Sequence, residues 1–517
     1  NDDGEGDPGE ADEDLERTTI ETPPPPEDIA SLMAEARDAV ATDDADEDEV
    51  PPEAPPAKPP AARPDPNDAL FGTPVPYGDV VHDRARNCLE DLAAMGAMRR
   101  PTPDEAWWCP RTEERLLARL DALVACGSEA LPAMVKLLEE RPLPDPELTW
   151  ANLFLFGSIA GDDALHAVQR VIGCVDLTAP GMTFAVADAL SHAPHPGVVA
   201  LVHPWLEHAD APFRVVAVTV LSRRDALGWE ALEARLQDGD LDVRRAAARS
   251  LARRASPPPL AVFEKLLRDD DGEVVRAAMR ASVLHRNDAG VRRAVEVVRE
   301  PGGASGDAAM VIAVSLAGEG FGLLLHGVQT DTRPASVEAL GWYGHLGAAQ
   351  ILIALLAHED KEVQKAAALA LWRLTGAPLT DDRPDPGYSD ENPAWTGTFR
   401  APERAAKLTG DPAVWSQWWQ KHGGRADTSK RHRFGHPWSV EDDLWEWEDH
   451  ASSPVARGWC HLELVARTGR SLPFDMDAFI PTQEAQMAAW RAHLASRRAS
   501  QPAGAWVTTP GEGAFRP

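Results

Sequence analysis

Four histidines lie close together in the sequence and are the first candidates for metal chemistry. They are His192, His195, His203 and His208. Zinc requires His, Cys or carboxylate ligands that converge on one point. His203 and His208 stand five residues apart on an expected helix, and this spacing does not place them on one face. We therefore expect histidines of loops and helix ends here, with no metal and no cofactor.

The cysteines indicate neither a disulfide framework nor a zinc knuckle. There are five, without a Cys-x-x-Cys pair: Cys88, Cys109, Cys126, Cys174 and Cys460. Scattered cysteines in an odd number are typical of reduced thiols in a cytosol. Cys126 and Cys174 are the nucleophiles nearest to the four histidines. An enzyme would have to bring these groups together in a deep pocket.

The segment Gly318–Gly322 is rich in glycine and resembles a phosphate-binding loop. A dinucleotide site needs a preceding strand and the spacing Gly-x-Gly-x-x-Gly. The spacing differs here, and we expect Val311–Ala317 to be helical. The segment is therefore interpreted as a turn between two helices. The sequence contains neither a Gly-Lys-Ser/Thr loop nor a Gly-x-Ser-x-Gly elbow.

Three tryptophans, Trp415, Trp418 and Trp419, follow a helical spacing. They could form a platform on which a nucleobase or a sugar stacks. The same spacing is typical of the buried face of a helix. A net charge of −32 argues against binding to nucleic acid. We therefore predict that these side chains form a core.

The segment Arg431–Trp438 combines basic, aromatic and imidazole groups. Its two histidines, His432 and His436, could carry out acid-base chemistry with a nearby carboxylate. Gly435 and Pro437 interrupt any helix at this point. We expect a structural role, in which the arginines stack on tryptophans and pair with acids.

The elements that position these groups repeat along the chain between residues 113 and 378. Three segments share an acidic start, a valine and paired alanines: Asp242–Leu251, Glu273–Ser282 and Glu362–Leu371. Repeats of roughly 28 to 31 residues have the length of a helical pair. One pair cannot bury its own apolar face, so neighbouring pairs must stack. The sequence predicts an all-α fold, an α-solenoid of roughly eight pairs.

This pattern resembles the short bacterial HEAT-like repeats, including those of the phycobilisome-lyase type. The segments Glu114–Leu123 and Leu464–Asp475 also resemble an uncharacterised bacterial HEAT-repeat family, over about residues 85–500. The resemblance implies an α-solenoid and brings no assigned activity. Some members are encoded near type VI secretion genes, which implies an accessory or toxin-neutralising immunity role. The lyases imply an enzyme or a chromophore handler as a further alternative.

Residues 1–67 form an acidic, proline-rich arm that we expect to be disordered. Residues 1–66 hold 22 Asp/Glu and 4 Lys/Arg, a net charge of −18. Such a segment repels itself and has little apolar surface to bury. Within 27–41, helical spacing predicts a motif that folds on a partner's groove: Ile29, Leu32, Met33 and Ala36. A transient helix without a role is the alternative.

Composition divides the rest of the chain into further parts. We expect a helical cap over 68–112 before the solenoid of 113–378. A proline- and aspartate-rich loop follows at 379–400. A tryptophan-rich helical C-terminal module then covers 401–498, and a frayed tail covers 499–517.

The repeats over 241–300 are locally basic, with 13 Lys/Arg against 9 Asp/Glu. In a solenoid such residues can form a stripe along one face. One hypothesis is that this stripe binds an acidic protein partner, or the chain's own acidic arm, with Arg244, Arg245, Arg249, Arg276 and Arg280 as the contact residues. The alternative is a solvated face with local ion pairs that contribute little.

Taken together, these patterns favour a non-enzymatic interaction scaffold. No apolar run approaches 18 residues, so we expect no membrane insertion. No signal peptide is visible, and we expect a cytoplasmic protein. The expected partner is another protein rather than nucleic acid.

Overall fold

The computed structural model describes twelve stretches of the chain. These are residues 77–100, 110–130, 134, 137, 144–300, 305–316, 318–377, 379–381, 408–425, 427–448, 453–495 and 503–506. All of them belong to one compact unit, Val75–Pro517. The predicted acidic arm 1–67, with its motif Ile29, Leu32, Met33 and Ala36, lies outside the described residues.

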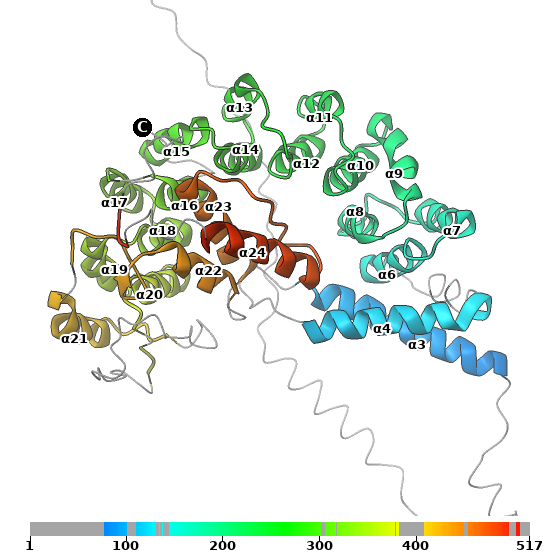
Figure 1. Ribbon diagram of the computed structural model, residues 1–517, viewed down its shortest axis with the longest axis horizontal. Coiled ribbons are helices and arrows are strands. Elements are labelled where there is room, and N and C mark those ends of the chain that lie inside the picture. Colours follow the sequence, from blue (N-terminus) through cyan, green and yellow to red (C-terminus); the bar gives the residue numbers. More distant parts are fainter. Residues whose placement is uncertain are drawn as a thin grey trace, which may run out of the picture. The chain divides into compact units, whose positions relative to one another are not determined.

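Helices stack in two rows that curve into a solenoid (Figure 1). The inner row contains α6 (Pro146–Phe156), α8 (Met182–His192), α10 (Ala211–Arg223), α12 (Leu241–Leu251), α14 (Gly272–Leu284), α16 (Ser305–Ser315), α18 (Pro334–Tyr343) and α20 (Lys361–Thr375). The outer row contains α7 (Asp162–Gly173), α9 (Gly197–Val202), α11 (Trp229–Arg235), α13 (Leu260–Leu266), α15 (Ala289–Arg299), α17 (Gly320–Thr330) and α19 (Ala349–Leu355). The prediction of an all-α solenoid is confirmed.

Short 3-10 turns occur along the solenoid, and a pair of helices precedes it. The 3-10 turns up to α19 in the described residues are η1 (Gly127–Ala130), η2 (His203–Glu207) and η3 (Leu346–Ala348). The helices α3 (Tyr77–Met98) and α4 (Pro110–Cys126) pack against each other, and α3 also packs on α6. Since α4 begins at Pro110, it crosses the boundary at 112 that composition indicated.

Aspartates cap the starts of the inner helices α12, α14 and α20, two residues before the acidic residues that begin the repeated segments. Asp240, Asp271 and Asp360 each accept a hydrogen bond from backbone N–H groups of the first helical turn. Such caps satisfy donors that a helix leaves unpaired. The alanines that follow are buried between neighbouring inner helices, as Ala247 and Ala278 are. Small side chains there let the helices approach closely, so the repeats stack.

The segment 401–498 does not form a single C-terminal module. Helix α21 (Pro412–His422), followed by η5 (Gly423–Arg425), packs on α19 at the end of the solenoid. Trp415 and Trp418 are buried there, and Trp419 is partly buried against the same core. The indole of Trp415 donates to the Thr409 carbonyl over 2.9 Å. The rest of the segment folds back along the inner face, because the exposed ends of the inner helices offer it hydrogen-bond acceptors.

A short hairpin makes this contact through β1 (His432–Arg433) and β2 (His436–Pro437). Its backbone N–H groups bond to carbonyls at the ends of two inner helices. His432 donates to Gly344 over 2.8 Å, and Phe434 donates to Arg373 over 2.6 Å. The last carbonyls of a helix have no partner within the helix. The hairpin therefore completes the C-terminal ends of α18 and α20.

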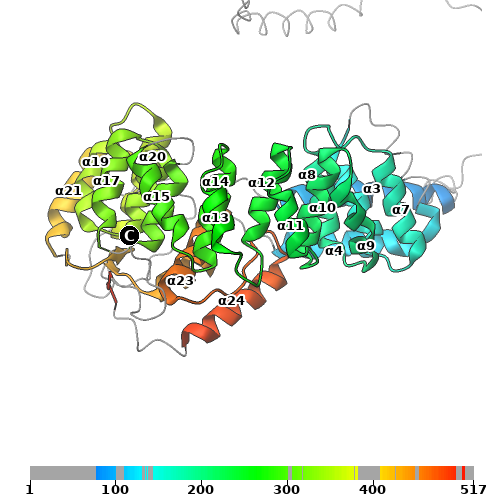
Figure 2. The ribbon, with the colours of Figure 1, turned by 90° about the horizontal axis from the view of Figure 1, so that it is seen from above.

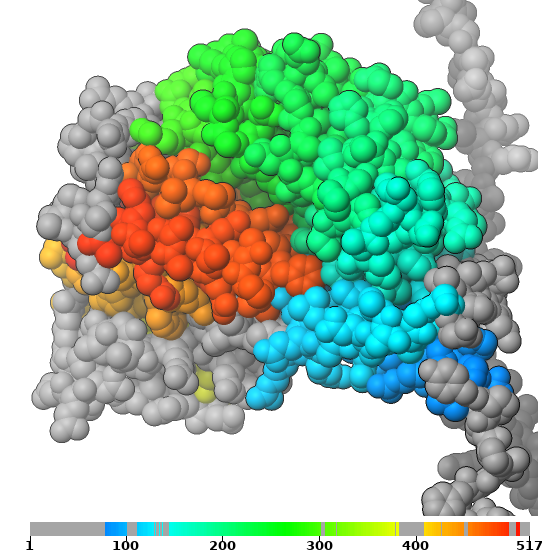
Figure 3. Space-filling model, turned by 45° about the vertical axis from the view of Figure 1, so that its right-hand side comes forward, coloured from blue at the N-terminus to red at the C-terminus, as the bar shows by residue number. Residues whose placement is uncertain are grey.

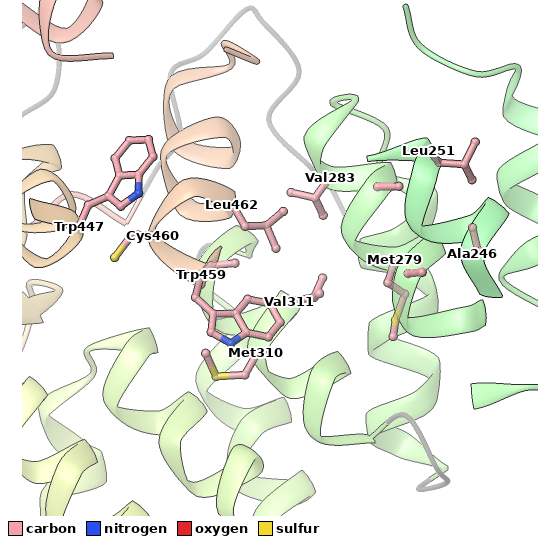
Figure 4. Packing of buried hydrophobic residues seen from close by; sticks show 14 of the residues in the cluster. Ala246, Leu251, Met279, Val283, Met310, Val311, Trp447, Trp459, Cys460 and Leu462 are labelled. Atoms are coloured by element: carbon pink, nitrogen blue, oxygen red, sulfur yellow. The ribbon is translucent and has the colours of Figure 1, made fainter. Parts of the chain in front are cut away.

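Beyond the hairpin, three helices lie inside the curve (Figure 1): α22 (Val440–Glu448), α23 (Pro454–Thr468) and α24 (Ile480–Ala495). Helix α23 packs against α14 and α16. Figure 4 shows Trp459 and Leu462 of α23 beside Met310 and Val311 of α16. All four side chains are buried, so the C-terminal helices share one core with the solenoid.

The C-terminal segment continues to the N-terminal hairpin (Figures 2 and 3). The backbone N–H of Ile480, at the start of α24, donates to the Glu113 carboxylate over 2.8 Å. Arg99, just after α3, donates to the Asp477 carbonyl over 2.9 and 3.0 Å. The loop between α23 and α24 thereby joins the N-terminal helices to the middle of the solenoid.

Candidate functional site

A pocket of about 740 Å³ lies on the inner face of the solenoid, beside the loop between α23 and α24. We call it the concave groove. Its walls come from three consecutive inner helices and from the C-terminal loop, and they include Thr183, Phe184 and Ala187 of α8, Val215, Thr219 and Arg223 of α10, Asp242, Ala246, Arg249 and Ser250 of α12, Arg253 in the turn after α12, and Asp477. The C-terminal helices cover the inner face beside α14 and α16, whereas this part stays accessible.

Small side chains form part of the lining of the groove. Ala187, Ala246 and Ser250 project little from their helices, and Ser250 uses its hydroxyl to bond the Ala246 carbonyl. Phe184 stands at the α8 wall with 58% of its surface exposed. The guanidinium of Arg100 lies 4.9 Å from the centre of its ring. An exposed aromatic side chain in a hollow is a typical anchor for a partner's apolar group.

Arginines of the repeats mainly hold one repeat to the next. The Arg214 side chain bonds Asp238 over 2.8 and 3.0 Å, and Arg245 bonds Asp271 over 2.7 and 3.1 Å. In each pair the aspartate lies beside the start of the following inner helix. The hydrogen bond from Arg245 lowers the pKa of Asp271 to about 2. These bidentate pairs fix the stacking of neighbouring repeats.

The structure gives the five arginines of the predicted stripe different surroundings. Arg244 donates to the Asp238 carbonyl over 2.9 Å. Arg276 and Arg280 both contact Asp307, and the Arg280 guanidinium lies 4.1 Å from the Trp459 ring of α23. Together with Arg245, these residues therefore have contacts within the chain. Arg249 is the member of the stripe that lines the concave groove.

Two groove arginines were missing from the predicted set, namely Arg223 and Arg253. Arg253 contacts Asp475 over 3.3 Å and Asp477 over 3.2 Å. Arg223 contacts Asp477 and, on its other side, Asp188 over 3.3 Å. Arg253 follows Arg249 by four residues and lies in the turn just after α12. The spacing of Arg249 and Arg253 is visible in the sequence, whereas the contacts of Arg223 and Arg253 with the C-terminal loop are not.

A buried polar cluster supports the groove from behind. Asp188 accepts a hydrogen bond from the Trp150 indole over 2.8 Å and lies 3.4 Å from His192. Burial by itself would raise the pKa of Asp188, but His192 and nearby arginines outweigh burial and lower it. Burial also lowers the pKa of His192. The cluster holds the Arg223 side chain toward the groove.

The other three histidines do not meet His192 at one point. The His195 ring bonds the Gly161 carbonyl over 3.1 Å and the Gly197 N–H over 3.0 Å. His203 is exposed in η2, and His208 accepts from the Asp210 N–H over 3.1 Å. Over the stretches that the structure describes, no three His, Cys, Asp or Glu side chains cluster as metal ligands do. The lining of the concave groove includes neither Cys126 nor Cys174.

The structure also places two other candidates from the sequence, the glycine-rich segment and the segment Arg431–Trp438. Gly318 and Glu319 lie in the turn between α16 and α17, whereas Gly320 and Gly322 belong to the first turn of α17, so the turn is shorter than the predicted Gly318–Gly322. The segment Arg431–Trp438 forms the docking hairpin, where the Arg431 guanidinium lies 4.5 Å from the Trp438 ring. His436 contacts Asp442 over 3.0 Å. No helix in the described part of the chain is long and apolar enough to cross a membrane.

The comparisons agree with the repeat architecture. Residues 199–284, which contain α10, α12 and α14, match the family model for HEAT repeats. Residues 344–376, which contain α19 and α20, match the model for the Armadillo/beta-catenin-like repeat. The chain therefore carries HEAT and Armadillo-type repeats.

Matches to whole proteins add little. No curated protein matches this chain. The crystal structure of an engineered protein shares 20% identity over 58% of this chain and 92% of its own. Its TM-score of 0.16 is too low to bear on fold or function.

Proposed function

We propose that this protein is a non-enzymatic interaction scaffold that binds a protein partner in the concave groove. Repeats of the HEAT and Armadillo types commonly mediate protein-protein interaction. The observation that carries the proposal is the groove itself, where Phe184 is exposed beside a floor of small residues. Exposed aromatic and arginine side chains are the residues most often responsible for binding energy at interfaces.

Site-specific crosslinking tests this function. A photoreactive phenylalanine derivative would replace Phe184 in the full chain, which is then irradiated in an extract of the native host. The matched control places it at Leu260 on the outer helix α13, another exposed apolar position with 47% of its surface exposed. We expect a defined protein adduct from position 184 and none from position 260. Equal adducts at both positions, or adducts at neither, would contradict a binding role for the groove.

The more specific expectations, about the family, the secretion role, the location and the partner motif, stay predictions. The comparisons give no support to a bacterial family, a type VI secretion role or lyase-type repeats. No contact in the groove favours an immunity role or a chromophore. The cytoplasmic location is likewise a proposal. So is the partner motif at Ile29, Leu32, Met33 and Ala36, which a comparison of the full chain and a 1–67 deletion in partner capture would test.

A further inference from the structure

The loop between α23 and α24 shows which chemistry this face of the solenoid accepts. Its two aspartates, Asp475 and Asp477, both contact Arg253, and Asp477 also contacts Arg223. These carboxylates come from a segment more than 200 positions away in the sequence. The inner face therefore already binds an acidic segment, at the edge of the concave groove.

Arg249 extends this positive edge into the groove. It lies on α12, four residues before Arg253, and 58% of its side chain is exposed. Its contact with Glu273 is 3.7 Å long, beyond hydrogen-bond distance, and Glu273 is itself 45% exposed. Such an exposed pair contributes little and is easily exchanged. A carboxylate of a partner could bond Arg249 without uncovering a buried charge.

The opposite wall of the groove is apolar. Phe184 is exposed there, and Val215 and Ala187 line the same pocket. Asp242, at the start of α12, disfavours further carboxylates at that end. The groove thus fits a segment with apolar side chains against α8 and acidic side chains against the C-terminal half of α12.

Asp477 occupies part of the positive edge from within the chain. Half of its side chain is exposed, and it lines the groove. Its backbone is held separately, since Arg99 donates to the Asp477 carbonyl. The carboxylate can therefore leave the arginines while the loop stays in place. A partner's carboxylate would replace one ion pair with another.

We propose, resting on the function proposed above, that the groove binds an acidic amphipathic segment of a partner protein and that Asp477 competes with this segment for Arg223 and Arg253. Neutralising Asp477 should then strengthen binding. Reversing the charge of Arg249 should weaken it. Higher salt should weaken it too, because exposed charges are screened.

A random peptide library displayed on phage, selected on the immobilised full chain, is the probe. We expect enrichment of peptides that combine Asp/Glu with large apolar residues. Synthetic copies should bind Arg249→Glu about tenfold more weakly than the wild type. They should bind Asp477→Asn about threefold more tightly. The matched controls are Arg268→Glu and Asp270→Asn, exposed positions in the loop after α13, which should bind as the wild type does.

Phe184→Ser separates the two proposals. Peptides that lose binding in Phe184→Ser but are not acidic and ignore Arg249→Glu would overturn the acidic partner and leave the groove as a binding site. Peptides unaffected by Phe184→Ser would overturn the groove itself. Weaker binding to Asp477→Asn would show that Asp477 contacts the ligand, which overturns the competition.

Discussion

The Arg433 guanidinium lies 2.7 Å from the Glu463 carboxylate, and neither side chain is exposed to solvent. Arg433 also bonds Asp443 and Glu446, and its guanidinium lies 4.5 Å from the Trp342 ring. This pairing joins the docking hairpin, α22 and α23 to the end of α18. It explains how a strongly charged segment can pack inside the curve of the solenoid.

Removing Arg433 should destabilise this region strongly. Arg433→Leu removes a buried cation shared by three buried carboxyl groups, and removing one partner of such a buried pair costs about 3–5 kcal/mol. Urea unfolding followed by tryptophan fluorescence would measure the loss. The control Arg470→Leu changes an exposed arginine just after α23 and should stay within about 0.5 kcal/mol of the wild type. Equal effects of the two substitutions would show that the buried network contributes nothing specific.

Position 344 requires a glycine because its backbone conformation is left-handed and because the hairpin lies very close to it. It has a φ of 78°, and a Cβ there would lie 2.2 Å from the His432 carbonyl oxygen. We expect Gly344→Ala to lower the free energy of unfolding by about 2 kcal/mol or more. Gly239→Ala is the control, because its Cβ would meet nothing within 4 Å. A Gly344→Ala protein as stable as Gly239→Ala would contradict the close approach.

Asp271 combines two roles, as the N-cap of α14 and as the partner of Arg245. Asp271→Ala removes both and should cost about 1–2 kcal/mol. Asp270→Ala, at the exposed neighbouring position, should change stability little. Thermal unfolding of the two variants side by side would measure the difference. The interpretation fails if Asp270→Ala costs as much.

Buried histidines should make the protein less stable as the pH falls from 6.5 toward 4. Burial lowers the pKa of His461 to about 4, although its ring bonds the Leu472 carbonyl over 2.9 Å. The unfolded chain takes up this proton near pH 6.5. Stability is therefore lost over the interval between these values, by up to about 3 kcal/mol from His461. His192 and His285, whose pKa values burial also lowers, act in the same direction.

The predicted loss of stability at low pH can be tested by measuring the free energy of unfolding in urea at several pH values and taking its slope against pH. His461→Gln should flatten the slope between pH 6.5 and 4. His326→Gln, at an exposed position of α17, should leave it unchanged. An unaltered slope in His461→Gln would show that the buried ring does not set this dependence.

Much of the architecture was predictable because its causes are local. The aspartate caps, the paired alanines and the spacing of roughly 28 to 31 residues indicate stacked helical pairs wherever they occur. The burial of Trp415 and Trp418 followed from their helical spacing. The structural role of Arg431–Trp438 followed from the types of its residues. Such signals depend only on residues that lie within a few helical turns of one another in the sequence.

The candidate site was only partly predictable. Arg249 was among the five arginines chosen from local basic charge, and it lines the groove, whereas the other four are held by closer contacts within the chain. Arg223 and Arg253 were not chosen, because their importance depends on Asp477, more than 200 residues away. Charge density along the sequence does not reveal which cations are already paired.

The sequence by itself determined that the helices form, where their caps lie and that neighbouring pairs stack. Only the tertiary structure decided that the C-terminal helices fold into the curve, and hence which part of the inner face stays accessible. The reason is physical. Caps and repeat faces act between residues close in the chain, whereas the hairpin at Gly344 and the loop at Asp477 meet surfaces that exist only after the solenoid has formed.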